Sequence, residues 1–252
     1  MNEPVIDVST IPRSTHDEAM RITAVENRRF SDALRSFDAE DWTKPTECLL
    51  WDVQSLAAHL VGSAAAQASP REFVRQVRNG KPLIAEIGAQ YWWDGMNELQ
   101  VRERAARTPT ELIEEWETAS ARALRARTKL PRLIARLPLL KLPEPVGRQQ
   151  LRYLFDMGFT RDVWAHRIDL ATATGRTFEA DRDHDGRILA DIVSEWSTTH
   201  DEPFTLQLEG PAGGCFTRGR TGEAVRLDAT EFVRILTERL HGEGVLRHPL
   251  PL

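Results

Sequence analysis

The first two-thirds of the chain carry apolar residues at the three- and four-residue spacing of amphipathic helices. Thr15 and Glu18 have the spacing of a helix-capping box, and apolar positions recur at helical spacing from Ile22 to Phe37. Asp52 is a residue typical of an N-cap, and the residues that follow it form a second apolar face. The sequence therefore predicts two helices separated by a connecting loop.

Three more helical segments are predicted further along the chain. Residues 89–107 form the first of them, and Thr108 with Glu111 repeats the capping-box spacing at the start of the second. A proline-rich stretch over residues 131–145 then marks a long connection that no regular helix crosses whole. The third segment covers approximately residues 149–174.

The pattern changes after Gly175. A helix near residues 187–198 is followed by three segments in which apolar and polar residues alternate, with glycine-rich turns between them (204–210, 213–219 and 223–228). A last helix begins near Asp228. The predicted fold class is therefore α+β overall, with an all-α N-terminal domain over residues 1–176 and a small α+β domain over residues 177–252.

Composition narrows the classes of function. The 252 residues carry a net charge of -5, which argues against sequence-independent binding of nucleic acid, because such binding needs a basic surface. The sequence has no run of roughly 18 apolar residues and no signal-peptide pattern at its N-terminus. Its two cysteines, Cys48 and Cys215, are too few for a disulfide framework. We expect a cytoplasmic monomer or homodimer without nucleic-acid or membrane partners.

Asp162 and His166 are the main candidates for chemistry. They lie four residues apart, so on a helix they share one face with their Cβ atoms about 6 Å apart. Apolar residues of the same stripe face the core, and buried polar groups need partners. A metal held also by His59, on the second helix, satisfies both residues, because a catalytic zinc site commonly uses three nitrogen or oxygen ligands. The alternative is a hydrogen bond between Asp162 and His166, or bonds from neighbouring arginines.

Three other residues lie near these candidates in the predicted elements. Asp169 follows His166 by three residues and is predicted to orient a metal ligand, with a surface salt bridge to a nearby arginine as the alternative. Asn97 is a candidate for directing its amide into the bundle, with an exposed position as the alternative. Cys48 is interpreted as a small packed hydrophobe rather than a reactive thiolate.

Two segments resemble the metal-binding segments of a known family. LLWDVQSLAAHL (49–60) resembles the Trp-x-Val-x-x-Leu-x-x-His segment of the DinB-like, mycothiol-dependent maleylpyruvate isomerase family of actinobacteria. RDVWAHRIDLATATGR (161–176) resembles the second metal segment of that family. Three later stretches resemble its C-terminal domain (181–200, 204–214 and 227–246). The resemblance covers nearly the whole chain in the same order.

The resemblance implies a fold and a ligand set. The fold is a DinB-like four-helix bundle with a metal at its core, followed by a small sterol-carrier-like α+β domain. The family's His, Glu and His ligands match His59, Asp162 and His166, so aspartate replaces glutamate here. A C-terminal arginine near the family's active site usually follows a glycine; Arg239 matches the arginine, but Glu238 stands in the position of the glycine.

The resemblance also implies an activity. We predict a metal-dependent and mycothiol-dependent thiol transferase or cis-trans isomerase, in which a divalent metal, expected to be zinc, activates the thiol for addition to a small electrophilic substrate. Arg239 is the predicted catalytic residue, and Asn97 and Asp169 are the predicted cofactor-binding residues. The partners are a small-molecule electrophile and a low-molecular-weight thiol. The alternatives are a metal-dependent hydrolase and a non-catalytic protein of the same fold that binds a small ligand.

Overall fold

The computed structural model describes residues 4–144 and 146–250, which fold into two compact units. The first unit combines Met1–Ala19, Arg136–Ala165 and Thr177–Leu252, and the second combines Met20–Ala135 and His166–Arg176. Both units are discontinuous in sequence, so the division of the chain at residue 176 stays a prediction. Within the described residues, no helix has both the length and the apolar character that a bilayer crossing requires.

The second unit is helical. It contains most of α1, the final turns of α8 and five further helices: α1 (His16–Arg35), α2 (Val53–Ala68), α3 (Pro70–Glu86), α4 (Trp92–Arg104), α5 (Pro109–Thr128), α6 (Arg132–Ala135) and α8 (Phe159–Thr174). The predicted caps are confirmed. The Asp52 carboxylate accepts from the Ser55 N–H at 2.8 Å, and the Glu111 carboxylate accepts from the Thr108 N–H at 2.8 Å. Sequence-local hydrogen bonds therefore set where α2 and α5 begin.

The predicted apolar face of α1 is partly buried. Phe30 and Leu34 are buried as predicted, whereas Ile22 and Val25 are only half-buried. The charged Glu26 is also fully buried, and its carboxylate accepts from Nε of Arg167, on α8, at 2.8 Å. The inner side of α1 therefore includes a buried ion pair that apolar spacing does not predict, and a buried charge requires such a hydrogen-bonded partner.

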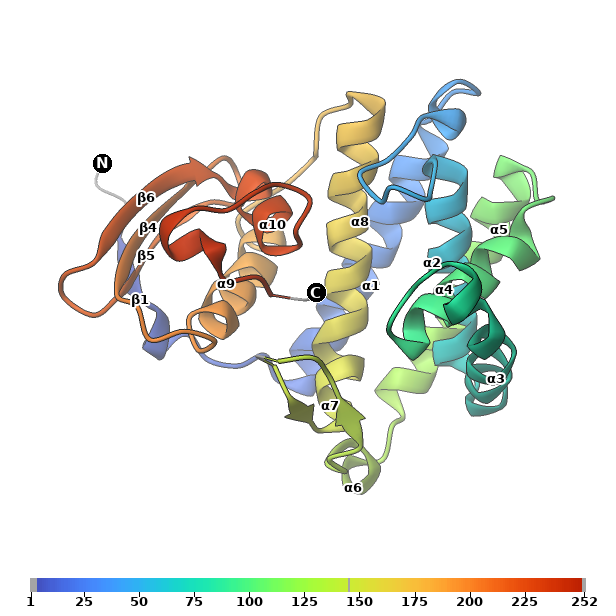
Figure 1. The fold of residues 1–252 in the computed structure, drawn as a ribbon, viewed down its shortest axis with the longest axis horizontal. Helices are drawn as coiled ribbons and strands as arrows, with labels where there is room; N and C mark the ends of the chain where they lie inside the picture. Colours follow the sequence, from blue (N-terminus) through green and yellow to red (C-terminus); the bar gives the residue numbers. More distant parts are fainter. Residues whose placement is uncertain (1–3, 145, 251–252) are drawn as a thin grey trace. The chain divides into compact units, whose positions relative to one another are not determined.

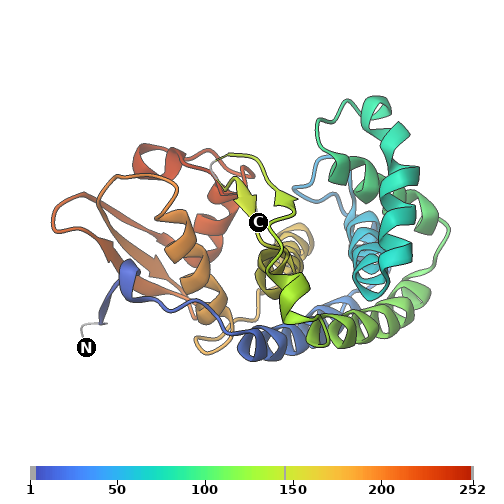
Figure 2. The ribbon, with the colours of Figure 1, turned by 90° about the horizontal axis from the view of Figure 1, so that it is seen from below.

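Helix α3 was not predicted. It begins at the N-cap Ser69, but Gly80 and Pro82 interrupt the helical pattern of its sequence. Gly80 lies against Gly95 of α4, where a Cβ on Gly80 would stand 2.5 Å from the Gly95 carbonyl oxygen. Figures 1 and 2 both show α3 and α4 side by side. Two glycines therefore bring these two backbones into contact.

The first unit contains a four-stranded mixed sheet in the order β1-β5-β4-β6. Its strands and helices, with a separate two-stranded ribbon, are β1 (Val5–Asp7), β2 (Leu140–Lys141), β3 (Arg148–Gln149), β4 (Phe204–Glu209), β5 (Gly214–Arg218), β6 (Glu223–Asp228), α7 (Leu151–Tyr153), α9 (Asp185–Trp196) and α10 (Ala229–Leu236). Strand β4 is antiparallel to β5 and parallel to β6, with Leu206 opposite both Phe216 and Val225. Strand β1, which has only three residues and was not predicted, pairs parallel to β5.

Strand β4 buries alternate side chains, as the period-2 pattern predicts. Phe204 on β4 and Phe232 on α10 both pack against Trp196 on α9, with ring centroids 5.0 and 5.3 Å apart. Figures 1 and 2 show α9 and α10 on the same face of the sheet. The predicted fold class, a helical part together with a small α+β part, is confirmed.

The close contact of α3 with α4 leads to a stability prediction. We expect Gly95→Ala to lower the free energy of unfolding by about 1–3 kcal/mol, because the added methyl has no space against the Gly80 carbonyl. Urea unfolding followed by circular dichroism measures the change. Asn97→Ala on the same helix is the control and should stay within about 0.5 kcal/mol of wild type. Equal stability of the two variants would contradict the close contact.

His200 is a buried histidine of the first unit. Its ring stacks on His248, with centroids 4.7 Å apart, and its Nε2 has no hydrogen-bond partner among the described residues. Burial, with a smaller contribution from the neighbouring His248, lowers the pKa of His200 from 6.5 to about 4. The His200 imidazole is therefore neutral in the folded protein at pH values where the same imidazole is protonated in the unfolded chain.

We expect His200 to make the protein less stable as the pH falls from about 6.5 to about 4, since the unfolded state binds the extra proton in that window. Between pH 7 and pH 5 its contribution to the loss is about 2 kcal/mol. His200→Phe keeps the aromatic contacts but does not titrate. Denaturant unfolding at both pH values should show a smaller loss for the variant, and an equal loss would refute the assignment.

Candidate metal centre

The candidate site begins with His59, near the middle of α2. Every residue from Leu56 to Ala64 is buried, and His59 itself is 3% exposed. The Trp51 indole stacks on the His59 ring, with centroids 4.9 Å apart and planes 28° apart. The imidazole is therefore shielded from water and depends on protein groups for its hydrogen bonds.

The second element of the site is α8. A π-helical turn (Leu154–Gly158) precedes it, so the predicted helical segment is interrupted there rather than continuous. Asp162, His166 and Asp169 follow one another on the same face of α8. His166 is 8% exposed and Asp169 is fully buried, while Asp162 is half-buried. The stripe therefore faces the protein interior at its C-terminal end.

The three predicted ligands lie together. The ligand atoms of His59, Asp162 and His166 are all within 4.8 Å of one another. The two imidazole rings meet edge to face, with centroids 5.4 Å apart, and both histidines belong to the second unit. Asp162 keeps its place one turn before His166 because both residues are on one continuous helix. This set of two imidazoles and one carboxylate is suited to a divalent metal such as zinc.

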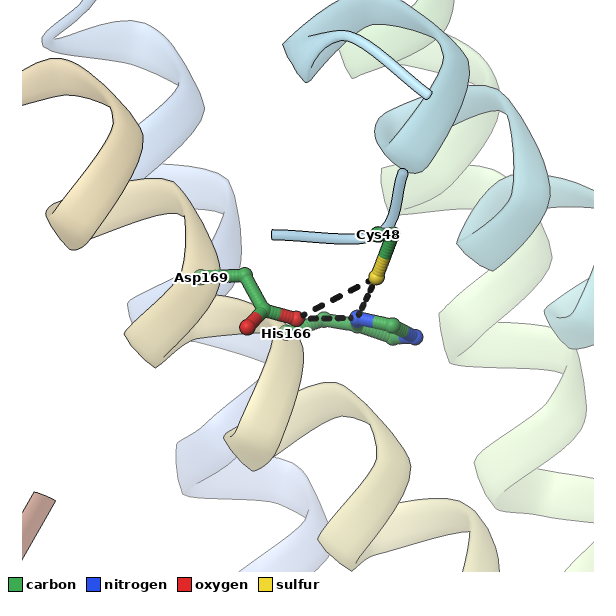
Figure 3. Close-up of side chains that lie close together, drawn as sticks. All are labelled: Cys48, His166 and Asp169. Carbon is green, nitrogen blue, oxygen red and sulfur yellow. Dashed lines mark hydrogen bonds and ion pairs between the residues drawn. The ribbon is translucent and has the colours of Figure 1, made fainter. Parts of the chain in front are cut away.

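Both imidazoles direct Nδ1 toward an oxygen. Nδ1 of His59 lies 2.8 Å from Oε1 of Gln100, and Nδ1 of His166 lies 2.8 Å from Oδ2 of Asp169. Figure 3 shows the second pair, with the other ring nitrogen of His166 turned away from Asp169. An ionised carboxylate only accepts hydrogen bonds, so Nδ1 of His166 carries the proton. Nε2 then holds the lone pair, which is the arrangement that a metal-binding histidine needs.

The arginines near the stripe bind other carboxylates. Nη1 of Arg161 donates to Glu195 at 2.5 Å, and Nε of Arg167 donates to Glu26 at 2.8 Å. These bonds favour the role of Asp169 as the acceptor that orients His166 over the alternative of a surface salt bridge.

Cys48 lies in the loop before α2 and is closer to the candidate ligands than the sequence suggested. Its Sγ is 3.9 Å from Nδ1 of His166, and its thiol donates to Oδ2 of Asp169 at 3.7 Å (Figure 3). The side chain is half-buried beside polar groups, so its interpretation as a packed hydrophobe is incomplete.

Cys48, His166 and Asp169 also have ligand atoms within 4.8 Å of one another. A metal bound by these three residues would have to displace the hydrogen bond between His166 and Asp169. A metal bound by His59, Asp162 and His166 leaves that bond in place and uses it to orient the ligand. The second set is therefore the better candidate.

The structure places the remaining candidates as follows. Asn97 is half-buried on α4, whereas Gln100, three residues later, is the α4 residue that contacts His59. Arg239 follows α10 in the first unit, where its Nη1 lies 3.5 Å from the Thr237 carbonyl oxygen. Glu238 has φ of 59°, a left-handed conformation that favours glycine. The roles predicted for Asn97 and Arg239 stay predictions.

Sequence reasoning missed Gln100 as a functional residue. A buried glutamine on an amphipathic helix has no motif of its own, and Gln100 is separated from His59 by 41 positions. The only signal was its spacing of three residues from Asn97, which places both side chains near one face of α4.

Comparisons with known proteins agree with the fold. Residues 23–171 match the family model described as the mycothiol maleylpyruvate isomerase N-terminal domain. Two crystal structures, of the mycothiol-dependent maleylpyruvate isomerase and of its histidine-to-alanine mutant, each align with a TM-score of 0.56 at 16% identity. Each alignment covers 93% of this chain and 92% of the other. A search of curated proteins gives no match.

The bond between His166 and Asp169 leads to a prediction about metal affinity. We expect Asp169→Asn to weaken zinc binding by about 10- to 100-fold, because the amide holds the proton on Nδ1 less firmly than the carboxylate does. Competition with a chromophoric zinc chelator measures the affinity.

Asp41→Asn is the matched control. Asp41 is a buried carboxylate of the same unit, and it is bonded to Lys44 at 2.8 Å and to Nε of Arg176 at 2.9 Å. Its replacement should lower stability and leave zinc affinity unchanged. Zinc binding by Asp169→Asn at wild-type strength would show that this carboxylate does not orient a ligand.

Proposed function

Because the chain belongs to the mycothiol maleylpyruvate isomerase N-terminal domain family, we propose that it is a metal-dependent enzyme that uses mycothiol to attack a small electrophilic substrate. The observation that carries the proposal is the convergence of His59, Asp162 and His166, with both Nδ1 atoms facing oxygen acceptors. These three residues would hold zinc through two nitrogens and one oxygen, and a three-ligand set of this kind is typical of catalytic zinc sites.

The ligand set fits a catalytic metal better than a structural one. Structural zinc sites commonly have four protein ligands, whereas the set argued here has three. Bound zinc supplies a Lewis acid that lowers the pKa of a coordinated thiol and so favours the thiolate at neutral pH.

The residues around the ligands have distinct tasks. Asp169 holds the proton on Nδ1 of His166, and Gln100 accepts from Nδ1 of His59, so both rings keep one orientation. Trp51 covers one face of the His59 ring and limits the access of water to it. We propose that Arg239 binds a carboxylate of the substrate and that Asn97 binds the thiol cofactor.

The proposed chemistry is thiolate addition. The thiolate sulfur forms a bond to an electrophilic carbon, and the electrons of the substrate double bond move toward its conjugated carbonyl group. When the adduct is protonated and released, the enzyme is an S-transferase. When the carbon–carbon bond rotates and the thiolate is expelled, the double bond returns with the opposite geometry, and the enzyme is a cis-trans isomerase.

The state of the cysteines supports a cytoplasmic location for this chemistry. Among the described residues, neither Cys48 nor Cys215 forms a disulfide bond, which is the usual state of cysteines in a reducing compartment. We propose that residues 1–176 hold the metal and the thiol and that residues 177–252 supply Arg239 to the substrate.

Elemental analysis of the purified protein tests the metal site first. We expect about one zinc per chain in wild type and none in folded His166→Ala, since two ligands do not retain the ion. His241→Ala, which removes an exposed histidine, is the control and should keep its zinc. Wild-type protein that binds no zinc even after resupply would overturn the metal-dependent mechanism and favour a binding protein.

Turnover with mycothiol tests the reaction. We expect the zinc-loaded protein to convert maleylpyruvate, or to form a mycothiol adduct with a related electrophile, only when mycothiol is present. The loss of substrate absorbance and mass spectrometry of the products measure the two outcomes. Zinc-loaded protein that shows no binding of mycothiol by calorimetry would refute the thiol-dependent reaction and favour a hydrolase.

A further inference from the structure

Two buried glutamines connect His59 to the opposite side of the helical unit. Gln100 on α4 and Gln76 on α3 are both fully buried. Nε2 of Gln100 donates to Oε1 of Gln76 at 2.7 Å, and Oε1 of Gln100 lies 2.8 Å from Nδ1 of His59. A continuous chain of hydrogen bonds therefore extends from α3 through α4 to α2, and all of its members belong to the second unit.

The far end of this chain determines its direction. Nε2 of Gln76 donates to the Gly62 carbonyl oxygen at 3.0 Å and to Oε1 of Glu72 at 2.9 Å. Both partners are acceptors. The Gly62 oxygen is a carbonyl, and Glu72 is a carboxylate whose pKa is held below its usual value by two hydrogen bonds from Arg75. The amide nitrogen of Gln76 must therefore face these oxygens.

The remaining orientations follow from that one. With its nitrogen engaged, Gln76 presents Oε1 to Gln100, so Gln100 must use its own nitrogen there. Gln100 then presents Oε1 to His59, and only a protonated Nδ1 can complete the bond. The opposite tautomer of His59 would place two acceptors against each other in a buried position.

Glycines make this chain of bonds possible. A Cβ on Gly62 would stand 2.5 Å from Cβ of Gln100, so the absence of a side chain lets Gln100 approach α2. The contact of Gly80 with Gly95 brings α3 close enough to α4 for their two amides to meet.

We infer that Gln100 and Gln76 are positioning residues that fix the tautomer of His59 with the proton on Nδ1 and the lone pair on Nε2. The importance of this tautomer for zinc rests on the proposed function, whereas the tautomer itself does not. Gln76 forms its side-chain hydrogen bonds with Gly62, Glu72 and Gln100, so it acts on His59 through Gln100.

Two separate measurements test the inference: the tautomer of His59 in metal-free protein and the affinity of the protein for zinc. Nitrogen-15 NMR of histidine-labelled, metal-free protein reports which ring nitrogen of His59 carries the proton, and the signals are assigned with His59→Ala. In wild type we expect protonated Nδ1. In Gln100→Met and Gln76→Met we expect a mixture of tautomers, because Gln76→Met leaves the Gln100 amide able to turn over. Chelator competition with zinc should show about 10- to 100-fold weaker binding.

Gln67→Met is the matched control. Gln67 lies on α2, the helix of His59, and is half-buried. Its amide donates to the Ser63 hydroxyl and accepts from Arg127. We expect this variant to keep both the tautomer and the zinc affinity. Gln100→Glu retains an acceptor opposite Nδ1, so it should restore the wild-type tautomer that Gln100→Met loses.

The outcomes separate this inference from the proposed function. Wild-type tautomer and zinc affinity in both methionine variants would overturn the positioning role and leave the proposed function intact. A changed tautomer in a protein that never binds zinc would support the positioning role and overturn the proposed function. If Gln100→Met does not fold, Gln76→Met decides the result, because Gln76 is one hydrogen bond further from His59 than Gln100 is.

Discussion

The enclosure of α2 by its neighbours is the constraint on which the helical unit depends. Its central turns are buried around the whole circumference, so His59 must find every hydrogen bond inside the protein. Two other helices supply polar side chains close to His59. Gln100 comes from α4, while His166 and Asp162 come from α8. The polar groups around His59 therefore come from helices that are separate in the sequence.

Helix α8 combines two buried polar features on different faces. One face carries His166 and Asp169, and another carries Arg167, which is paired with Glu26 of α1. Buried ion pairs contribute little net stability, but removal of one partner leaves an uncompensated charge in the interior. The pair thus restricts the rotation of α8, and the same restriction directs His166 toward His59.

The sequence predicted the elements that carry strong local signals. Helices α2 and α5 were predicted because Asp52 and Thr108 cap them, and the three sheet strands of the C-terminal region were predicted because their side chains alternate. Helix α3 was missed because Gly80 and Pro82 weaken its pattern, although both fit the structure. His59, Asp162 and His166 could be proposed from spacing and resemblance. Gln76 and Gln100 could not, because their roles arise only when three helices pack together.

The glycine contacts around the two glutamines have an evolutionary consequence. Gly80 and Gly95 each face backbone atoms of the other helix, and Gly62 faces Cβ of Gln100, an atom that every residue except glycine carries. The three glycines should therefore persist among relatives that keep this helix packing, whether or not the glutamines do. A lineage that loses one of the glutamines keeps the close helix contacts but must orient its histidine with another group of the bundle.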